Sequence, residues 1–116
     1  MGKNIVVVDD ESRIRKIYKR FLTAEGYEVM EAANADRANE LVKWHSVDLV
    51  LLDIKMPVVQ GEILFEVLQA FHRSTKVLVT SVYPLDEQKK LIQGASDYYD
   101  KSQGLAVLLN KIRQLV

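Results

Sequence analysis

Runs of β-branched and aliphatic residues recur along the chain and predict five β-strands. The first run, Ile5–Val8, is apolar at every position, which suits a strand buried on both faces of a sheet. Four further runs cover residues 27–32, 47–52, 77–80 and 95–99. The carboxylates of Asp9, Asp10 and Glu11 follow the first run directly. A buried strand that leads into three like charges is unfavourable unless a cation lies close by.

The segments between these runs have helical periodicity. Apolar residues at positions 14, 17, 21 and 22 share one helical face, and Gly26 follows as a stop signal. Asn34 is a suitable N-cap for the second helix and Ser102 for the last. Trp44 is expected to pack partly into the core, and the fourth helix, over 85–92, is short and weakly patterned. The other apolar stripes are Ala38, Leu41 and Val42; Ile63, Leu64, Val67, Leu68 and Phe71; and Leu105, Leu108, Leu109 and Ile112.

Strands that alternate with helices in this way predict an α/β fold. The expected architecture is a doubly wound (βα)5 parallel sheet in the flavodoxin-like order 2-1-3-4-5, covered by helices on both faces in three αβα layers. With 116 residues the chain is long enough to bury its own core. It contains neither a repeat nor a linker and ends with the fifth predicted helix. We therefore expect residues 1–116 to form a single domain without an output domain.

Composition narrows the function classes. The chain has no cysteine, which excludes disulfides and thiolate metal sites. Its 16 basic and 16 acidic residues cancel, so nothing predicts direct nucleic-acid binding. No secretory signal precedes the first strand, and no apolar stretch approaches 18 residues. These features predict a cytoplasmic protein that does not bind membranes.

Three carboxylates are expected to meet at one edge of the sheet. Asp9 and Asp10 follow the first strand, and Asp53 ends the third. In the order 2-1-3-4-5 these strands are neighbours, and ligands bind outside their carboxyl ends. Each Asp alone would equally suit a helix cap. Three together favour a hard cation such as Mg²⁺, which is bound through one or two carboxylates, waters and phosphate oxygens.

Two further side chains end neighbouring strands and suit a phosphoryl group. Lys101 follows the fifth strand and would supply a cation, and Ser81 follows the fourth and would donate a hydroxyl hydrogen bond. A lone lysine is usually a solvated charge and a lone strand-end serine usually a turn residue. Their position at this edge argues for a role at the site.

The motifs "VVVDDE", "DLVLLDIKMP", "TSVY" and "GASDYYDK" occur in this order over residues 3 to 115. In this combination the chain resembles the receiver domain of two-component response regulators. The resemblance implies that Asp53 is the phosphoacceptor and that Lys101 binds the phosphoryl group. Asp9, Asp10, Asp53 and the backbone carbonyl of Lys55 would hold Mg²⁺ or Mn²⁺. Ser81 would be the switch hydroxyl.

The resemblance also implies that Tyr98 is the aromatic switch residue whose rotamer follows Ser81. Thr80 is the next candidate for the switch hydroxyl, but Ser81 has the usual spacing from Asp53. The chain departs from the family pattern at Ser102, where the family has proline after the lysine in a cis bond. The loop there either keeps a strained cis bond or is rebuilt with trans geometry. The segment from Ser81 to Gly94, which contains the fourth predicted helix, is about two residues shorter than is usual in the family.

The implied function is transfer of a phosphoryl group to Asp53 from a sensor histidine kinase or a histidine phosphotransfer domain. The chain would then switch the face formed by the fourth helix, the fifth strand and the fifth helix, and act on a downstream protein not identified by the sequence. It would not be an enzyme in the usual sense, since it catalyses only its own phosphorylation and slow dephosphorylation. A phosphorylation-dependent homodimer would use charges such as Asp97, Asp100, Lys89 and Arg113.

Three other functions are less consistent with the residues. A haloacid-dehalogenase-type phosphohydrolase needs a second acid two residues after the nucleophile, where this chain has Lys55. A flavin-binding domain of the same topology needs Ser, Thr and Gly amides in its first loop, where this chain has anions. The remaining alternative is a non-phosphorylated pseudo-receiver that acts as a docking module, although the complete acidic set argues against it.

Two positions are expected to set the lifetime of the phosphorylated state. Lys55 lies two residues after Asp53, and Tyr83 lies two residues after Ser81. In the family these positions flank the path of water to the acyl phosphate. A long lysine beside a bulky tyrosine is predicted to block that path and slow dephosphorylation. The alternative interpretation is that both are ordinary solvated loop residues.

Overall fold

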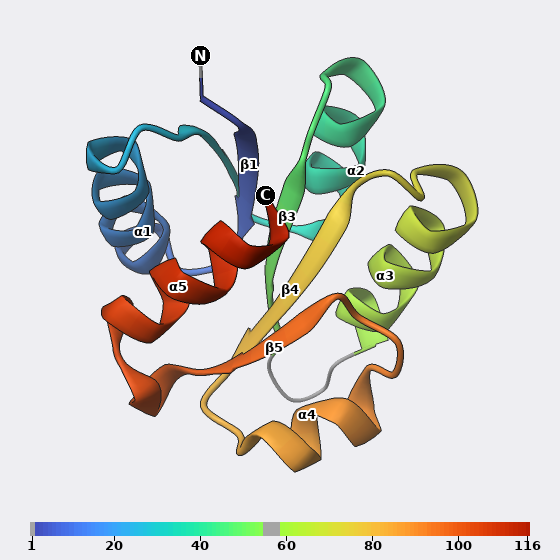
Figure 1. Ribbon diagram of the computed structural model, residues 1–116. Helices are drawn as coiled ribbons and strands as arrows, with labels where there is room; N and C mark the ends of the chain where they lie inside the picture. The colour runs from blue at the N-terminus through green and yellow to red at the C-terminus, as the bar shows by residue number, and fades with distance from the viewer. Residues whose placement is uncertain (1, 55–58) are drawn as a thin grey trace.

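Five parallel strands form one sheet in the order β2-β1-β3-β4-β5, which confirms the predicted topology (Figure 1). The computed structural model describes residues 2–54 and 59–116. The strands are β1 (Asn4–Val8), β2 (Glu28–Ala32), β3 (Leu49–Asp53), β4 (Lys76–Ser81) and β5 (Asp97–Asp100). The helices are α1 (Ser12–Ala24), α2 (Ala35–Trp44), α3 (Val59–Phe71), α4 (Leu85–Leu91) and α5 (Leu105–Leu115), with a 3-10 turn η1 (Lys101–Gln103) before α5.

The sheet separates two apolar layers, as Figure 1 shows for the helices on its two faces. Ile5 and Val7 of β1 pack on the side of α1 and α5. Val6 and Val8 pack on the side of α2, α3 and α4. All four side chains are at most 6% exposed. The continuous apolar run at the start of the chain is therefore explained by burial on both faces of a parallel sheet.

Parallel pairing brings the carboxyl ends of β1, β3, β4 and β5 to one edge of the sheet. Val8 of β1 is paired with Leu52 of β3, so Asp9 and Asp53 each follow a paired residue by one position. Asp53 is paired with Thr80 of β4, and Ser81 is paired with Asp100 of β5. The polar residues of four segments thus lie in register at the carboxyl edge of the sheet.

Several local predictions are confirmed. Asn34 caps α2 by accepting a hydrogen bond from the amide of Arg37 at 2.8 Å. Gly26 follows α1 with a φ of 95°, a backbone conformation that favours glycine and ends the helix. The fourth helix forms and is short, with seven residues.

Other local predictions are wrong. Ser102 does not cap the last helix: it lies in η1, and α5 begins at Leu105 after Gly104, whose φ is 90°. Trp44 does not pack into the core, since it is 74% exposed. Phe71, another predicted stripe member, is 78% exposed. Trp44 and Phe71 are the last residues of α2 and α3, where a helix end has fewer neighbours to pack against.

Two further stripe residues, Ile17 and Ile63, are 48% and 55% exposed and lie at the margins of their helical faces. Among the described residues, no helix is long and apolar enough to cross a membrane.

Candidate functional site

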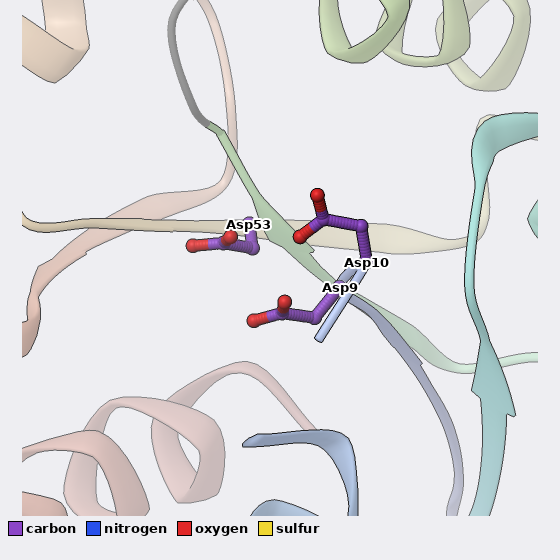
Figure 2. Close-up of side chains that lie close together, drawn as sticks. All are labelled: Asp9, Asp10 and Asp53. Carbon is purple, nitrogen blue, oxygen red and sulfur yellow. The ribbon is translucent and has the colours of Figure 1, made fainter. Parts of the chain in front are cut away.

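Three carboxylates meet beyond the carboxyl ends of β1 and β3 (Figure 2). One carboxylate oxygen from each of Asp9, Asp10 and Asp53 lies within 4.8 Å of the other two. The side chains of Asp9 and Asp53 are only 1% and 4% exposed, whereas Asp10 is exposed. The sequence therefore predicted this juxtaposition correctly. Its physical basis is the order of the sheet, which makes β1 and β3 neighbours.

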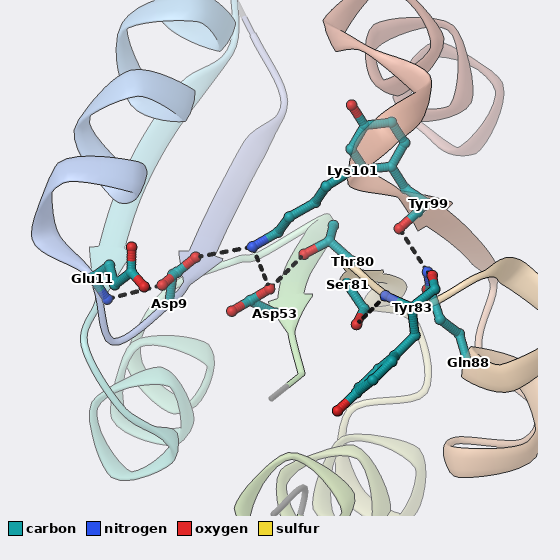
Figure 3. Close-up of polar contacts among 9 residues, drawn as sticks. All are labelled: Asp9, Glu11, Asp53, Thr80, Ser81, Tyr83, Gln88, Tyr99 and Lys101. Carbon is teal, nitrogen blue, oxygen red and sulfur yellow. Dashed lines mark hydrogen bonds and ion pairs between the residues drawn. The ribbon is translucent and has the colours of Figure 1, made fainter. Parts of the chain in front are cut away.

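Asp9 is held by the backbone around it. Its Oδ1 accepts a hydrogen bond from the amide of Glu11 at 2.8 Å, just before α1. The amide of Asp9 donates to the carbonyl of Ala32, and its own carbonyl accepts from Arg15 at 2.6 Å. One oxygen thus orders the turn before α1 without capping the helix, whose N-cap is Glu11, while Oδ2 faces Lys101 (Figure 3).

Lys101 reaches into the carboxylate cluster from the loop after β5. Its Nζ lies 2.7 Å from Oδ1 of Asp53 and 3.8 Å from Oδ2 of Asp9 (Figure 3). Its side chain is 22% exposed, so the lysine is only partly shielded from solvent. The Lys101 ammonium group therefore offsets part of the repulsion among the carboxylates in this structure.

The turn η1 orients the residue that carries this ammonium group. Asp100 caps η1 by accepting from both the amide and the hydroxyl of Ser102, at 2.9 and 2.8 Å. Gln103 completes a capping box by accepting from the amide of Asp100 at 3.1 Å. The hydrogen bonds from Ser102 lower the pKa of the Asp100 carboxyl. Ser102 thus serves a local cap that the family's proline, lacking an N–H, would not form.

The two hydroxyls at the end of β4 have different partners. Thr80 donates to Oδ1 of Asp53 at 3.4 Å. Ser81 is fully buried, and its Oγ accepts from the amide of Tyr83 at 3.1 Å. In this conformation Thr80 contacts Asp53, whereas Ser81 stabilises the loop between β4 and α4.

Tyr98 and Tyr99 point to opposite faces of β5, as the alternation of a strand requires. The hydroxyl of Tyr98 donates to the carbonyl of Ile92 at 2.6 Å and accepts from the amide of Ala95 at 3.2 Å. Tyr98 is 8% exposed. Its ring is therefore packed inward and its hydroxyl is anchored to the segment that follows α4.

Two neighbours of the site were not found by sequence reasoning. Arg15 is 13% exposed and bridges the carbonyl of Asp9 to Glu31 of β2, at 2.6 and 3.2 Å. Tyr18 is buried on α1, and its pKa is raised by burial and by the nearby Tyr99, Asp53 and Asp9. Neither carried a distinguishing signal, because α1 contains several basic and apolar residues that are equivalent in sequence.

The donor set suits a divalent cation. Asp9, Asp10 and Asp53 would supply carboxylate oxygens, which are the ligands that Mg²⁺ and Mn²⁺ prefer. The side chains of Asp9 and Asp53 are buried and Asp10 is exposed. A cation bound between them would therefore remain accessible, on the side of Asp10, to waters and to a phosphate oxygen. The predicted carbonyl ligand of Lys55 lies outside the described residues. Tyr83, the other residue predicted to control dephosphorylation, is partly exposed beside Ser81 (Figure 3).

Residues 5–113 match the family described as "Response regulator receiver domain". The uncharacterized transcriptional regulatory protein YrkP of Bacillus subtilis is 37% identical over 105 residues, which are 87% of this chain and 44% of that protein. The chemotaxis protein CheY of Treponema pallidum is 32% identical and is covered to 81%, with 97% of this chain aligned. The chain spans about two fifths of the length of several curated relatives, such as the Cyanidium caldarium regulator ycf27 at 40%.

Solved structures agree with this assignment. The response regulator TrrA of Thermotoga maritima, in complex with Mg²⁺–BeF, has a TM-score of 0.87 and 32% identity, covering 98% of this chain and 99% of TrrA. The BeF3-activated N-terminal receiver domain of Klebsiella pneumoniae RstA has a TM-score of 0.86 and 30% identity, covering 97% of each chain. The family match over nearly the whole chain, the sheet order and the cluster of strand-end aspartates lead to one conclusion: the chain belongs to the receiver-domain family of response regulators.

Proposed function

We propose that the chain accepts a phosphoryl group on Asp53 from a phosphohistidine and uses it to switch the surface around α4, β5 and α5. The observation that carries this proposal is the contact of 2.7 Å between Lys101 Nζ and Oδ1 of Asp53, at the end of β3 and beside two more carboxylates. The arrangement places a carboxylate nucleophile next to a cation that can bind the transferred group.

The chain's own residues would act mainly by position and charge. A carboxylate oxygen of Asp53 forms a bond to phosphorus while the bond from phosphorus to the imidazole nitrogen breaks, and that nitrogen keeps its electron pair. Lys101 would offset negative charge on the phosphoryl oxygens. The Thr80 hydroxyl, which donates to Asp53 in this structure, would be placed to donate to a phosphoryl oxygen. Mg²⁺ held by Asp9, Asp10 and Asp53 would supply further neutralisation of the phosphoryl oxygens.

The acyl phosphate would then change the partners of Ser81. Its Oγ now accepts from the amide of Tyr83. Moving the hydroxyl toward a phosphoryl oxygen would weaken that contact and open space beside β4, into which the already buried ring of Tyr98 would shift. Because the hydroxyl of Tyr98 is bonded to Ile92 and Ala95, its rotation would disturb the segment after α4. The result is a population shift between two conformations.

A histidine kinase is the phosphoryl donor that we propose for this chain. The similar protein TrrA has been solved in complex with the histidine kinase ThkA, with a TM-score of 0.83 to this chain and 32% identity. A histidine phosphotransfer domain presents the same phosphoimidazole and is an equivalent donor. The downstream partner of this chain would be a protein that recognises the switched surface around α4, β5 and α5.

A phosphorylation-dependent homodimer would require new partners for residues on that surface. Asp97 lies 3.5 Å from Lys111, and Arg113 lies 3.2 Å from Glu25, both within the chain. Asp100 caps η1. These groups would have to exchange partners before they could form ion pairs between two copies.

Incubation with acetyl phosphate and Mg²⁺, followed by intact mass measurement, tests the proposal. We expect one phosphoryl adduct in the wild type and in Asp36→Asn, which removes an exposed carboxylate on α2. Asp53→Asn should give none. A folded wild type without an adduct, or an adduct that persists in Asp53→Asn, would refute phosphorylation at Asp53. The first result would favour the docking-module alternative.

A further inference from the structure

Gln88 places a buried amide between three segments of the proposed switch. The side chain is 0% exposed. Its Nε2 donates to the carbonyl of Tyr83 at 2.8 Å and to the carbonyl of Tyr99 at 3.0 Å. One side chain on α4 therefore joins the loop after β4 to strand β5 (Figure 3).

A glutamine is chemically unexpected at this position. It lies on the inward face of α4 with Leu85 and Leu91, which pack against the core, as does Ile92 just after the helix. Its backbone is already satisfied, because its amide donates to Pro84 and its carbonyl accepts from Ile92. An apolar residue would fill such a site without desolvating an amide. The side-chain amide is thus needed only for its two hydrogen bonds.

The orientation of the amide follows from its partners. If Nε2 and Oε1 were exchanged, the carbonyl oxygen would face two backbone carbonyl oxygens, which is repulsive. In the observed orientation Oε1 is buried and has no hydrogen-bond partner among the described residues. An unsatisfied buried acceptor is unfavourable. The arrangement is therefore stabilised by two hydrogen bonds and opposed by one unsatisfied acceptor.

Gln88 and Ser81 hold the same residue from two sides. Ser81 Oγ accepts from the amide of Tyr83, and Gln88 donates to the carbonyl of Tyr83. Both side-chain bonds to the Tyr83 backbone therefore belong to the conformation in which Ser81 faces the loop rather than a phosphoryl group.

We propose that Gln88 is a positioning residue for the switch. It holds the loop at 82–84 in the unphosphorylated conformation and, through Tyr99, couples movement of that loop to β5. This inference rests on the proposed function, since it concerns the response to phosphorylation at Asp53. Its substitution should leave phosphoryl transfer intact but change the balance between the two conformations.

The test uses Gln88→Met, which keeps the length and volume of the side chain and removes both donors. Gln93→Met is the matched control, because Gln93 is exposed just after α4. Amide spectra are recorded without ligand and with Mg²⁺ and beryllofluoride, a phosphoryl analogue. The amide of Ala95, which donates to the Tyr98 hydroxyl, reports the tyrosine rotamer.

In Gln88→Met we expect the unliganded Ala95 signal to move toward its beryllofluoride position. Loss of the hydrogen bond to Tyr83, which belongs to the unliganded conformation, changes the ratio of the two conformations by about two- to tenfold. Hydrogen exchange of the Tyr83 amide should accelerate by a similar factor, and the Asp53 adduct should still form. Gln93→Met should match the wild type in all three measurements.

An Ala95 signal that stays at its wild-type position in Gln88→Met, with unchanged Tyr83 exchange, would overturn the role of Gln88. A signal that moves off the line between the two wild-type positions would also overturn it, since that indicates local distortion only. If Gln88→Met fails to fold, Gln88→Asn provides the same readouts, because its shorter amide cannot reach both carbonyls. Failure of the proposed function is distinct: the wild type itself would then form no adduct.

Discussion

Replacement of Lys101 by methionine tests how the carboxylate cluster is stabilised. The ammonium group contacts Asp53 at 2.7 Å and lies 3.8 Å from Asp9, and both carboxylate side chains are almost fully buried. Methionine keeps much of the apolar stem and removes the charge. Three carboxylates within 4.8 Å of one another then lose the ammonium group that η1 places beside them.

The magnitude follows from burial. Removing one partner of a buried ion pair costs about 3–5 kcal/mol. Because the Lys101 side chain is 22% exposed, water reduces the loss, and we expect about 2–3 kcal/mol without divalent metal. Mg²⁺ at ten times its dissociation constant stabilises the folded wild type by about 1.4 kcal/mol. Mg²⁺ should stabilise Lys101→Met by more, because the carboxylates have lost a competing cation.

Urea unfolding followed by far-UV circular dichroism, in EDTA and in Mg²⁺, measures both effects. Fluorescence is less suitable, since Trp44, the single tryptophan, is 74% exposed. Lys90→Met, at an exposed lysine of α4, is the matched control. The double variant Lys101→Met with Asp53→Asn should recover part of the loss. A loss below about 0.5 kcal/mol, or equal Mg²⁺ increments in wild type and variant, would refute this account of the charge balance.

Three further predictions concern the switch and its environment. Ser81→Ala should still accept the phosphoryl group, but beryllofluoride should shift the amides around Tyr98 less than in the wild type; equal shifts would move the switch role to another hydroxyl. The raised pKa of Tyr18 means that its contribution to stability is complete below the ordinary value of 10.0 and is lost as pH rises above it. Tyr18→Phe should therefore flatten the decline in stability measured above about pH 10. Lys55→Asn with Tyr83→Glu should lose its phosphoryl group several-fold faster than the wild type in a mass time course, whereas unchanged loss would contradict occlusion of the attacking water.

The sequence determined the architecture because its signals are local and periodic. Continuous apolar runs such as Ile5–Val8 require burial on both faces, and the helical stripes between them supply the layers that provide it. Given that topology, the convergence of Asp9, Asp10 and Asp53 follows from strand order alone. These features depend on residue type and spacing, which a sequence displays directly.

The tertiary structure decided which neighbouring groups make contact. The sequence favoured Ser81 over Thr80 by its spacing from Asp53, but only the packing of β4 against β3 shows which group each hydroxyl contacts. The Thr80 hydroxyl donates to Asp53, and the Ser81 hydroxyl accepts from the amide of Tyr83. The sequence could not foresee the burial of Gln88, because one inward-facing polar residue on a weakly patterned helix has no periodic signal. Side-chain partners at this edge depend on small differences in the positions of segments that are far apart in the chain. Those positions are fixed only when both layers of the core are packed.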